Sequence, residues 1–423
     1  MFKRERPSHS QGRKKTFLMV LTLLFGSTAN AVDFNWSLEA FGYGVGHNWL
    51  SSAINPQNET VQLPSWTAEL DLRPEVSLSA GDSWRAVARP RLFLEEDWTQ
   101  APPLPGYNVA GHANFRFDDV YAAYTPNGPF SLSAGVQNFQ WGPAELLGPS
   151  NPLFHFMTDE RSALFRQQGE VLAKASYFLT ANLSLIALVE PLSNGAPSWV
   201  AGEPFTPEGL VKLEQRFSNA GDYVGLTLGR MEEGIPFVGE YGTVYLNDAI
   251  SVYADAREST GSPAYYPQAQ NGGVVFTKSE TQSASALVTA GIRWEGAIDT
   301  RLEYIFNSYG YDPATYVLAL AGATLSPQNL AQVLSPGLEL YRKHYLYLSL
   351  RTDRLGQGDK LRLSARYLLS LEDGSGSVTF PLEWSFTDNL TAILQPLVSY
   401  GTSTSEFLQA ENFELLGAIR LAI

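Results

Sequence analysis

The last eleven residues of the chain, from Phe413 to Ile423, carry an apolar residue or glycine at every second position. A strand of a closed membrane barrel shows one face to lipid and the other to the lumen, so its apolar residues recur with this period. The segment therefore predicts the closing strand of a transmembrane β-barrel. The residues on the expected lipid face are Phe413, Leu415, Gly417, Ile419, Leu421 and Ile423.

The start of the chain has the three parts of a signal peptide. Basic residues precede an apolar run from Thr16 to Phe25, and Ala29-Asn30-Ala31 provides a small-x-small cleavage site. The apolar run is shorter than the roughly twenty residues that a spanning helix needs. We therefore expect residues 1–31 to be removed and residues 32–423 to form a single barrel domain.

The amino-acid composition further narrows the class of protein. The chain is 44% hydrophobic and 12% aromatic, yet no later apolar stretch is long enough for a membrane helix, which leaves a barrel as the membrane architecture. The net charge of −14 argues against nucleic acid as a partner, since binding it depends on Lys and Arg. The absence of Cys excludes disulfides and thiolate chemistry.

Candidate strands are joined alternately by long and short connections. The short ones carry turn residues, as in Gly81-Asp82, Asn127-Gly128 and Asn247-Asp248. This rhythm predicts an all-β, transmembrane antiparallel β-barrel of about eighteen strands. The predicted strands are 35–46, 66–79, 84–95, 117–125, 130–139, 169–179, 183–190, 210–217, 222–230, 240–246, 249–257, 285–295, 300–308, 343–352, 360–371, 377–386, 390–399 and 412–423.

An even number of strands puts the short turns in the periplasm and the long loops outside the cell. A soluble β-sandwich also has alternating strands, but it explains neither the leader nor the unequal connections. We therefore expect the protein in the outer membrane of a Gram-negative bacterium. Its expected partners are the outer-membrane lipids and the barrel-assembly machinery, which would recognise the C-terminal strand.

A barrel of this size leaves an aqueous lumen, because about eight strands are already filled by side chains. Charged residues recur at alternate positions, on the face expected to line the pore. Clustered Arg would favour anionic or sugar-like solutes through charge steering and forked hydrogen bonds, although each residue could instead belong to a neutralised, solvated wall. The predicted pore-lining and selectivity residues are Glu69, Asp71, Arg73, Arg85, Arg89, Arg91, Lys212, Arg216, Arg257, Arg293, Arg301, Arg362 and Arg366.

Two long connections stand out. Residues 140–168, the third external loop, are rich in Pro, Gly and large apolar residues, which favours a compact loop that folds into the barrel and constricts it; an external cap is the alternative. Residues 309–342 form a long external loop, in which Ser326-Pro327 predicts a helix start. The predicted constriction residues are Trp141, Gly142, Pro143, Glu145, Asn151, Pro152 and Phe154.

An enzymatic function finds little support. The sequence contains no G-x-S-x-G or H-E-x-x-H motif. His155 with Asp159 and Glu160 is the best catalytic constellation available, and a loop histidine in water is the simpler interpretation. We expect no enzyme, no cofactor and no metal site.

One passage resembles known proteins. Gly135-x-Gln137, Trp141-Gly142 and Asn151-Pro152 together resemble a G-x-Q…W-G…N-P passage of uncharacterised proteobacterial outer-membrane porins. The predicted strand number and the Arg-rich walls are similar to those of the alginate-export porin family. No site residue of that family is transferred to this chain. Ile423 also departs from the aromatic residue that usually ends such barrels.

The resemblance and the residue pattern imply the same function, which is passive diffusion of small or anionic, sugar-like solutes across the outer membrane. The alternative is a non-conducting barrel that acts as a scaffold or as a surface-polysaccharide assembly or export factor.

Overall fold

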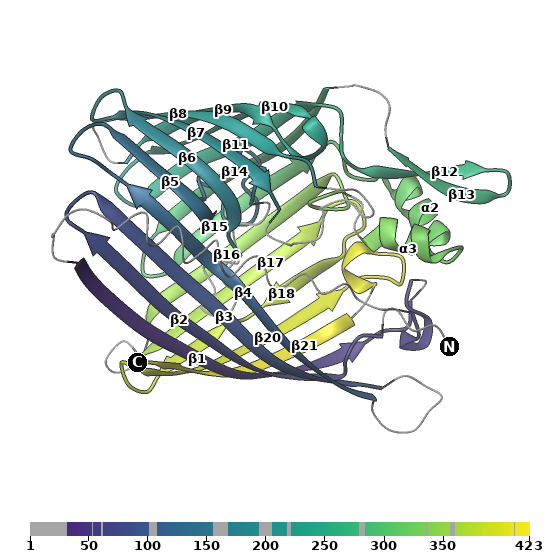
Figure 1. The fold of residues 1–423 in the computed structure, drawn as a ribbon. Helices are drawn as coiled ribbons and strands as arrows, with labels where there is room; N and C mark the ends of the chain where they lie inside the picture. Colours follow the sequence, from purple (N-terminus) through teal and green to yellow (C-terminus); the bar gives the residue numbers. More distant parts are fainter. Residues whose placement is uncertain are drawn as a thin grey trace, which may run out of the picture.

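The strands form one closed antiparallel β-barrel (Figure 1). The computed structural model describes residues 32–52, 54–60, 62–100, 108–154, 168–193, 205–217, 221–278, 284–334, 337–355, 360–409 and 411–423. Since β18 and β19 are two pieces of one wall strand, the barrel has 18 strands, which confirms the predicted fold class and strand number. The predicted signal peptide lies outside the described residues.

The wall strands have the following bounds. They are β1 (Val32–Trp49), β2 (Trp66–Ala80), β3 (Trp84–Thr99), β4 (Asn108–Tyr124), β5 (Phe130–Gln137), β6 (Glu170–Phe178), β7 (Leu183–Leu192), β8 (Glu208–Arg216), β9 (Tyr223–Arg230), β10 (Pro236–Tyr245), β11 (Ile250–Thr260), β14 (Ala284–Glu295), β15 (Asp299–Asn307), β16 (His344–Leu355), β17 (Leu361–Ser370), β18 (Gly376–Thr379), β19 (Leu382–Ser385), β20 (Leu390–Tyr400) and β21 (Glu411–Ala422).

The first and last strands close the barrel. β1 pairs with β21 from Glu39 opposite Ala422 up to Trp49 opposite Glu411. Leu38 and Ile423 continue the ladder, each donating its backbone N–H to the carbonyl of the other, at 3.0 and 2.9 Å. A closed ladder leaves no strand edge at the seam, which is a requirement for strands that cross a bilayer.

Side chains alternate between an inward, buried face and an outward, exposed face. In β11, Tyr253, Asp255 and Arg257 are buried, whereas Val252 before them and Ala254 between the first two are exposed. The same period runs through β8, β10 and β15. Outward apolar side chains exposed in this way are expected where lipid covers them.

The two ends of the barrel differ. At the end that we call the turn end, a side-chain oxygen organises several tight turns: Thr180 accepts from the Leu183 N–H, Asn247 from the Ile250 N–H and Thr387 from the Leu390 N–H. Among the described residues, no helix is long and apolar enough to cross a membrane.

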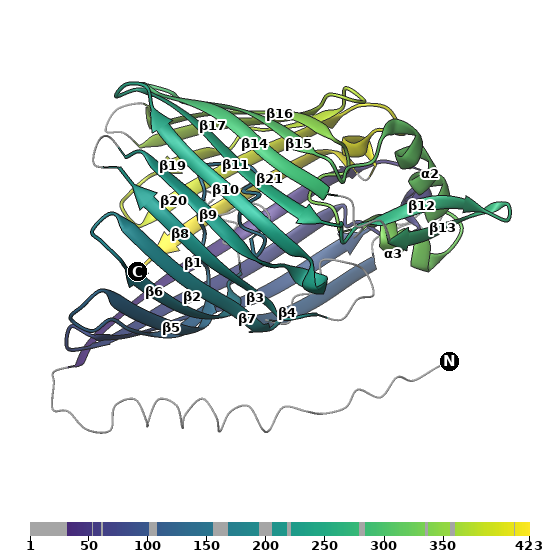
Figure 2. The ribbon, with the colours of Figure 1, turned by 90° about the horizontal axis from the view of Figure 1, so that it is seen from above.

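Longer segments gather at the opposite end, the loop end (Figure 2). The connection between the predicted strands 249–257 and 285–295 contains a hairpin of β12 (Tyr265–Gln270) and β13 (Gly273–Lys278), which the sequence did not predict. The predicted 309–342 loop contains α2 (Pro313–Ala323), which the sequence analysis missed, and α3 (Pro327–Leu334), which it anticipated; Ser326 accepts a hydrogen bond from the Asn329 N–H at its start. The short helices are η1 (Pro56–Asn58), η3 (Glu232–Gly234) and η4 (Glu406–Leu408).

Three predicted boundaries were wrong. The long segment 96–116 is mostly strand, because β3 and β4 extend toward the loop end; Gly111 and Ala113 are too small to reveal the outward face in the sequence. The connection from β9 to β10 is short, since β10 begins at Pro236. The predicted strand 377–386 is divided into β18 and β19 near Pro381, whose ring nitrogen cannot donate to the ladder.

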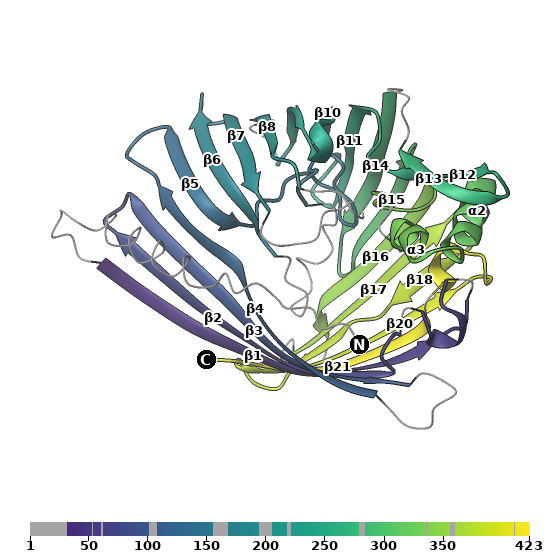
Figure 3. The same cartoon turned by 45° about the vertical axis from the view of Figure 1, so that its right-hand side comes forward.

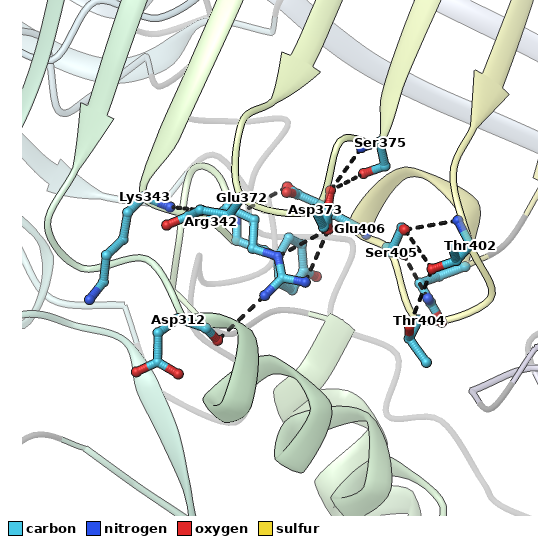
Figure 4. A network of polar contacts seen from close by, with 12 residues as sticks. Asp312, Arg342, Lys343, Glu372, Asp373, Ser375, Thr402, Thr404, Ser405 and Glu406 are labelled. Atoms are coloured by element: carbon cyan, nitrogen blue, oxygen red, sulfur yellow. Dashed lines mark hydrogen bonds and ion pairs between the residues drawn. The ribbon is translucent and has the colours of Figure 1, made fainter.

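A polar network fastens the helical segment to neighbouring loops at the loop end (Figure 4). Arg342, only 2% exposed, donates to Asp373 at 3.0 and 3.2 Å and lies 4.0 Å from the ring centroid of Tyr316 in α2. Asp373 also accepts from the backbone N–H of Glu406. The Arg342 guanidinium thus connects its own segment with α2 and with the loop that contains Asp373.

Substituting Arg342→Ala should release α2 from the loop end. Breaking a buried ion pair costs about 3–5 kcal/mol, because it leaves the other charge without its partner. We expect chymotrypsin to cleave the refolded variant within α2 much faster than the wild type. Lys343→Ala, at the adjacent position, is the matched control; equal cleavage of both variants would contradict the role of Arg342.

The buried carboxyl group of Glu406 makes this network sensitive to pH. Glu406 accepts from the Tyr341 N–H at 3.1 Å and from the Tyr345 hydroxyl at 2.5 Å. Burial raises the pKa of Glu406 from 4.5 to about 7, which favours the protonated form in the folded state. Between these two pKa values the folded state holds more protons than the unfolded state, so stability falls as the pH rises.

Glu406→Gln should remove this pH dependence. A shift of this size corresponds to about 3 kcal/mol, lost between pH 4.5 and about 7 in the wild type. We would compare the free energy of unfolding by urea in liposomes across this range. Parallel curves for the wild type and the variant would show that Glu406 contributes nothing.

Candidate functional site in the barrel lumen

The segment after β5 leaves the wall and runs inside the barrel (Figure 3). We call its described part, Asn138–Phe154, the inner loop. Its contacts are with inward-facing side chains of β7, β8, β10, β11 and β14 to β16. Residues 155–167 of the predicted constriction loop, with His155, Asp159 and Glu160, lie outside the described residues.

Two buried carboxylates hold the middle of the inner loop. Glu303 of β15 accepts from the backbone N–H of Glu145 at 2.5 Å and of Leu146 at 3.1 Å. The side chain of Glu145 contacts Arg301 at 3.0 Å and accepts from Ser349 at 2.8 Å. Hydrogen bonds to ionised groups are among the stronger ones in proteins, so this part of the loop is firmly attached to β15 and β16.

A third carboxylate holds the end of the loop. Asp255 of β11 accepts from the Ser150 N–H at 2.7 Å, and Thr289 of β14 donates to the Leu147 carbonyl at 3.0 Å. Gly142 has a φ of +93°, and a Cβ there would lie 2.1 Å from an Asp255 oxygen. Only glycine therefore allows this approach.

Apolar packing fixes the loop on its other side. Trp141 and Phe154 are buried in one cluster with Leu188, Leu210 and Tyr241, which face inward from β7, β8 and β10. Leu147 packs in a second apolar cluster with Ile305 of β15 and Tyr345 of β16, so on the side of β15 and β16 apolar contacts support the loop together with the carboxylates. All seven predicted constriction residues lie in the inner loop: Trp141, Gly142, Pro143, Glu145, Asn151, Pro152 and Phe154.

The predicted wall residues fall on the inward face, and carboxylates neutralise most of their cations. Asp71 is fully buried and accepts from both Arg73, at 2.7 Å, and Arg91, at 2.9 and 2.6 Å. Arg89 bridges Glu75 and Asp119. The remaining pairs are Lys212 and Arg216 with Glu214, Arg257 with Glu339, Arg293 with Asp299, Arg301 with Glu145, and Arg362 with Glu383.

Within the described chain, four inward wall cations have no carboxylate partner. They are Arg85 and Arg366, which the sequence analysis named, and Lys174 of β6 and Arg420 of β21, which it missed. The Nζ atom of Lys174 lies 4.0 Å from the ring centroid of Phe139 in the inner loop. The inward period of β6, with Leu172, Lys174 and Ser176 in turn, was the signal that could have found Lys174.

Two cavities flank the beginning of the inner loop. One, of about 650 Å³, is lined by Arg85, Lys174 and Asn138 among others. The second, of about 760 Å³, is lined by Trp141, Lys212 and other polar side chains. Ser131 borders both cavities. They combine cations, amides and aromatic rings, which can hold a small anionic or hydroxylated solute.

One other group of side chains has the composition of a metal site. The ligand atoms of His47, Glu411 and Glu414 lie within 4.8 Å of one another at the loop end of the seam. The Nδ1 atom of His47 is 2.7 Å from Glu411, so an ion pair or hydrogen bond already accounts for the contact.

The fold and its polar lumen define the class: the protein is an 18-stranded outer-membrane β-barrel. An apolar outer face on a closed barrel places it in the outer membrane of a Gram-negative bacterium, as predicted.

Comparisons with known proteins agree with this class. No family model matches the chain, and no curated protein matches it. Among solved structures from Pseudomonas aeruginosa, OccK7 (OpdD) is similar with a TM-score of 0.55 and 13% identity, over 92% of this chain and 99% of that one. The outer membrane protein OpdK has a TM-score of 0.51 and 11% identity, over 92% and 98%. These likenesses show the fold; the resemblance to alginate-export porins stays a prediction.

Glu303→Ala should loosen the inner loop. The backbone N–H groups of Glu145 and Leu146 would lose their acceptor, at a cost of about 1–3 kcal/mol for each unsatisfied group. We expect faster hydrogen exchange at these two amides while the amides of β15 remain protected. Glu258→Ala, which removes an outward-facing carboxylate of β11, is the control; unchanged exchange in Glu303→Ala would contradict the anchoring role.

Proposed function

We propose that the protein is a passive porin for small, anionic, sugar-like solutes. The observation that carries this proposal is the position of the inner loop, which crosses the lumen beside a cavity lined by Arg85 and Lys174. These cations lack carboxylate partners in the described part of the chain. They would therefore attract an anionic solute, whereas most other cations of the wall are already neutralised by carboxylates.

The proposed mechanism is diffusion past the inner loop, without conformational work or covalent chemistry. Cations confined between low-dielectric walls raise the local concentration of anions. Arg85 can bind a carboxylate through a fork of two N–H groups, whereas Lys174 acts as a point charge. Side-chain amides and the Phe139 ring, which is held beside Lys174, add contacts for hydroxylated rings. Binding has to remain weak, because a solute must also leave.

A solved relative in fold supports the choice of solute. OccK2 (OpdF) of Pseudomonas aeruginosa, crystallised in complex with glucuronate, has a TM-score of 0.51 and 11% identity over 92% of this chain and 96% of that one. Glucuronate combines a sugar ring with a carboxylate. We extend this solute class to the present chain as part of the proposal.

Charge substitution tests the proposal. The double variant Arg85→Gln, Lys174→Gln should lower the anion-to-cation permeability ratio, measured as the reversal potential of single channels in a salt gradient. Lys360→Gln is the control, because Lys360 is an exposed residue whose Nζ donates to the Phe386 carbonyl at the turn end. Glucuronate should reduce the wild-type current more than neutral glucose does, and the double variant should lose this difference.

Two results would count against the proposal. An unchanged reversal potential in the double variant would remove Arg85 and Lys174 from selectivity. A folded barrel that does not conduct, even when residues 140–168 are deleted, would favour the alternative function as a scaffold or a surface-polysaccharide assembly or export factor.

A further inference from the structure

The outward face of the barrel contains one charge in an unexpected place. Most of the charged outward residues of the described wall strands lie near strand ends, as Glu96 does in β3, Arg230 in β9 and Glu258 in β11. Glu240 differs, because it is the fifth residue of the ten-residue strand β10. A strand of about nine to eleven residues spans the hydrocarbon layer, so Glu240 lies near the middle of the membrane.

The direction of the Glu240 side chain is clear from its neighbours. Gly239 and Tyr241 on either side are buried and contact the inner loop or its cluster, whereas Glu240 is exposed. Its cross-strand partners are Leu226 and Ala256, both on the outward face. Its carboxylate makes no hydrogen bond or ion pair within the described residues. Glu240 therefore presents an unpartnered acid to the surroundings of the barrel.

Lipid is a poor environment for such a group. Acyl chains offer no hydrogen-bond donor, and a charged side chain on the lipid face of a barrel becomes more costly with depth. The adjoining outward residues are apolar, including Val224, Leu226 and Val244. This contrast indicates that another protein, rather than lipid, covers Glu240.

The surface around Glu240 also has the shape of a contact site. The small residues Gly242, Ala254 and Ala256 leave a hollow of about 740 Å³ on the outward face of β8 to β11. Leu226 and Val244 border it, at 37% and 48% exposure. A hollow beside projecting apolar side chains can pack against a similar surface.

We propose that this surface, the outward face of β8 to β11 around Glu240, binds a second copy of the same chain. Copies inserted in the same direction and related by a twofold axis along the membrane normal place equal residues at equal depths. The two Glu240 side chains would therefore face each other. Two adjacent carboxyl groups can share one proton, so that one donates a hydrogen bond to the other. The second copy thus supplies the partner that lipid cannot.

A single cysteine tests this contact, because the chain has no Cys of its own. Ala256→Cys places a thiol opposite Glu240, and Ala392→Cys places one on the outward face of β20, between Trp384 and Ile419. Both proteins are reconstituted in liposomes and treated with a short bismaleimide. We expect the cross-linked dimer fraction to be at least about tenfold higher for Ala256→Cys, which corresponds to about 1.4 kcal/mol.

Substitutions at Glu240 in the Ala256→Cys protein test the chemistry of the contact. Glu240→Gln should retain the dimer, because two amides can exchange hydrogen bonds. Glu240→Arg should reduce it at least about tenfold, since two like charges would meet at low dielectric. Glu96→Arg, which changes an outward carboxylate near the end of β3, is the matched control and should leave the dimer unchanged. Heat-modifiable mobility in gels verifies that each barrel is folded.

The proposal is overturned if Ala256→Cys cross-links no better than Ala392→Cys, or if native mass spectrometry of the wild type from nanodiscs gives only monomers. Either result would mean that water and lipid headgroups reach Glu240 without a protein partner. If Glu240→Arg does not fold, the comparison of Ala256→Cys with Ala392→Cys still tests whether this surface binds a second copy.

Discussion

The hydrogen-bond ladder between β1 and β21 is the constraint on which the rest of the structure depends. Backbone groups that face hydrocarbon find no water, so every spanning strand must have a partner on both sides. Closure fixes an inside and an outside, and the side-chain period then assigns each residue to one of them. The charged residues of the wall and the inner loop are kept away from lipid because the closed barrel encloses them.

Inside the ring, buried carboxylates organise the chain as much as apolar packing does. Asp255 and Glu303 accept backbone N–H groups of the inner loop, while Asp71 joins two arginines of the wall. One apolar cluster contains Leu147 of the inner loop, Tyr345 of β16 and Tyr316 of α2. The inner loop and the helices at the loop end thus share one core, and movement of either one changes the packing of the other.

The sequence predicted most of the wall. Period-two patterns and short turns identified 18 strands, and the Ser326-Pro327 start anticipated α3. It did not predict α2 or the β12–β13 hairpin, whose burial depends on contacts with each other and with the barrel rim. Glycine and alanine hid the extension of β4. The period of β6 places Lys174 on the inward face, but its contact with Phe139 of the inner loop depends on the tertiary structure.

The sequence by itself determined the class of fold, the location in the outer membrane and, where apolar and charged residues alternate, the face on which strand residues lie, because these follow from local periodicity. Only the tertiary structure decided which cations are neutralised, where the inner loop is attached and that Glu240, among apolar neighbours, has no partner in the described residues. Such properties depend on distances between residues far apart in the chain. Arg91 is neutralised by Asp71 and Arg301 by Glu145, whereas Arg85 has no carboxylate partner among the residues that the structure describes. No pattern within a single strand distinguishes these outcomes.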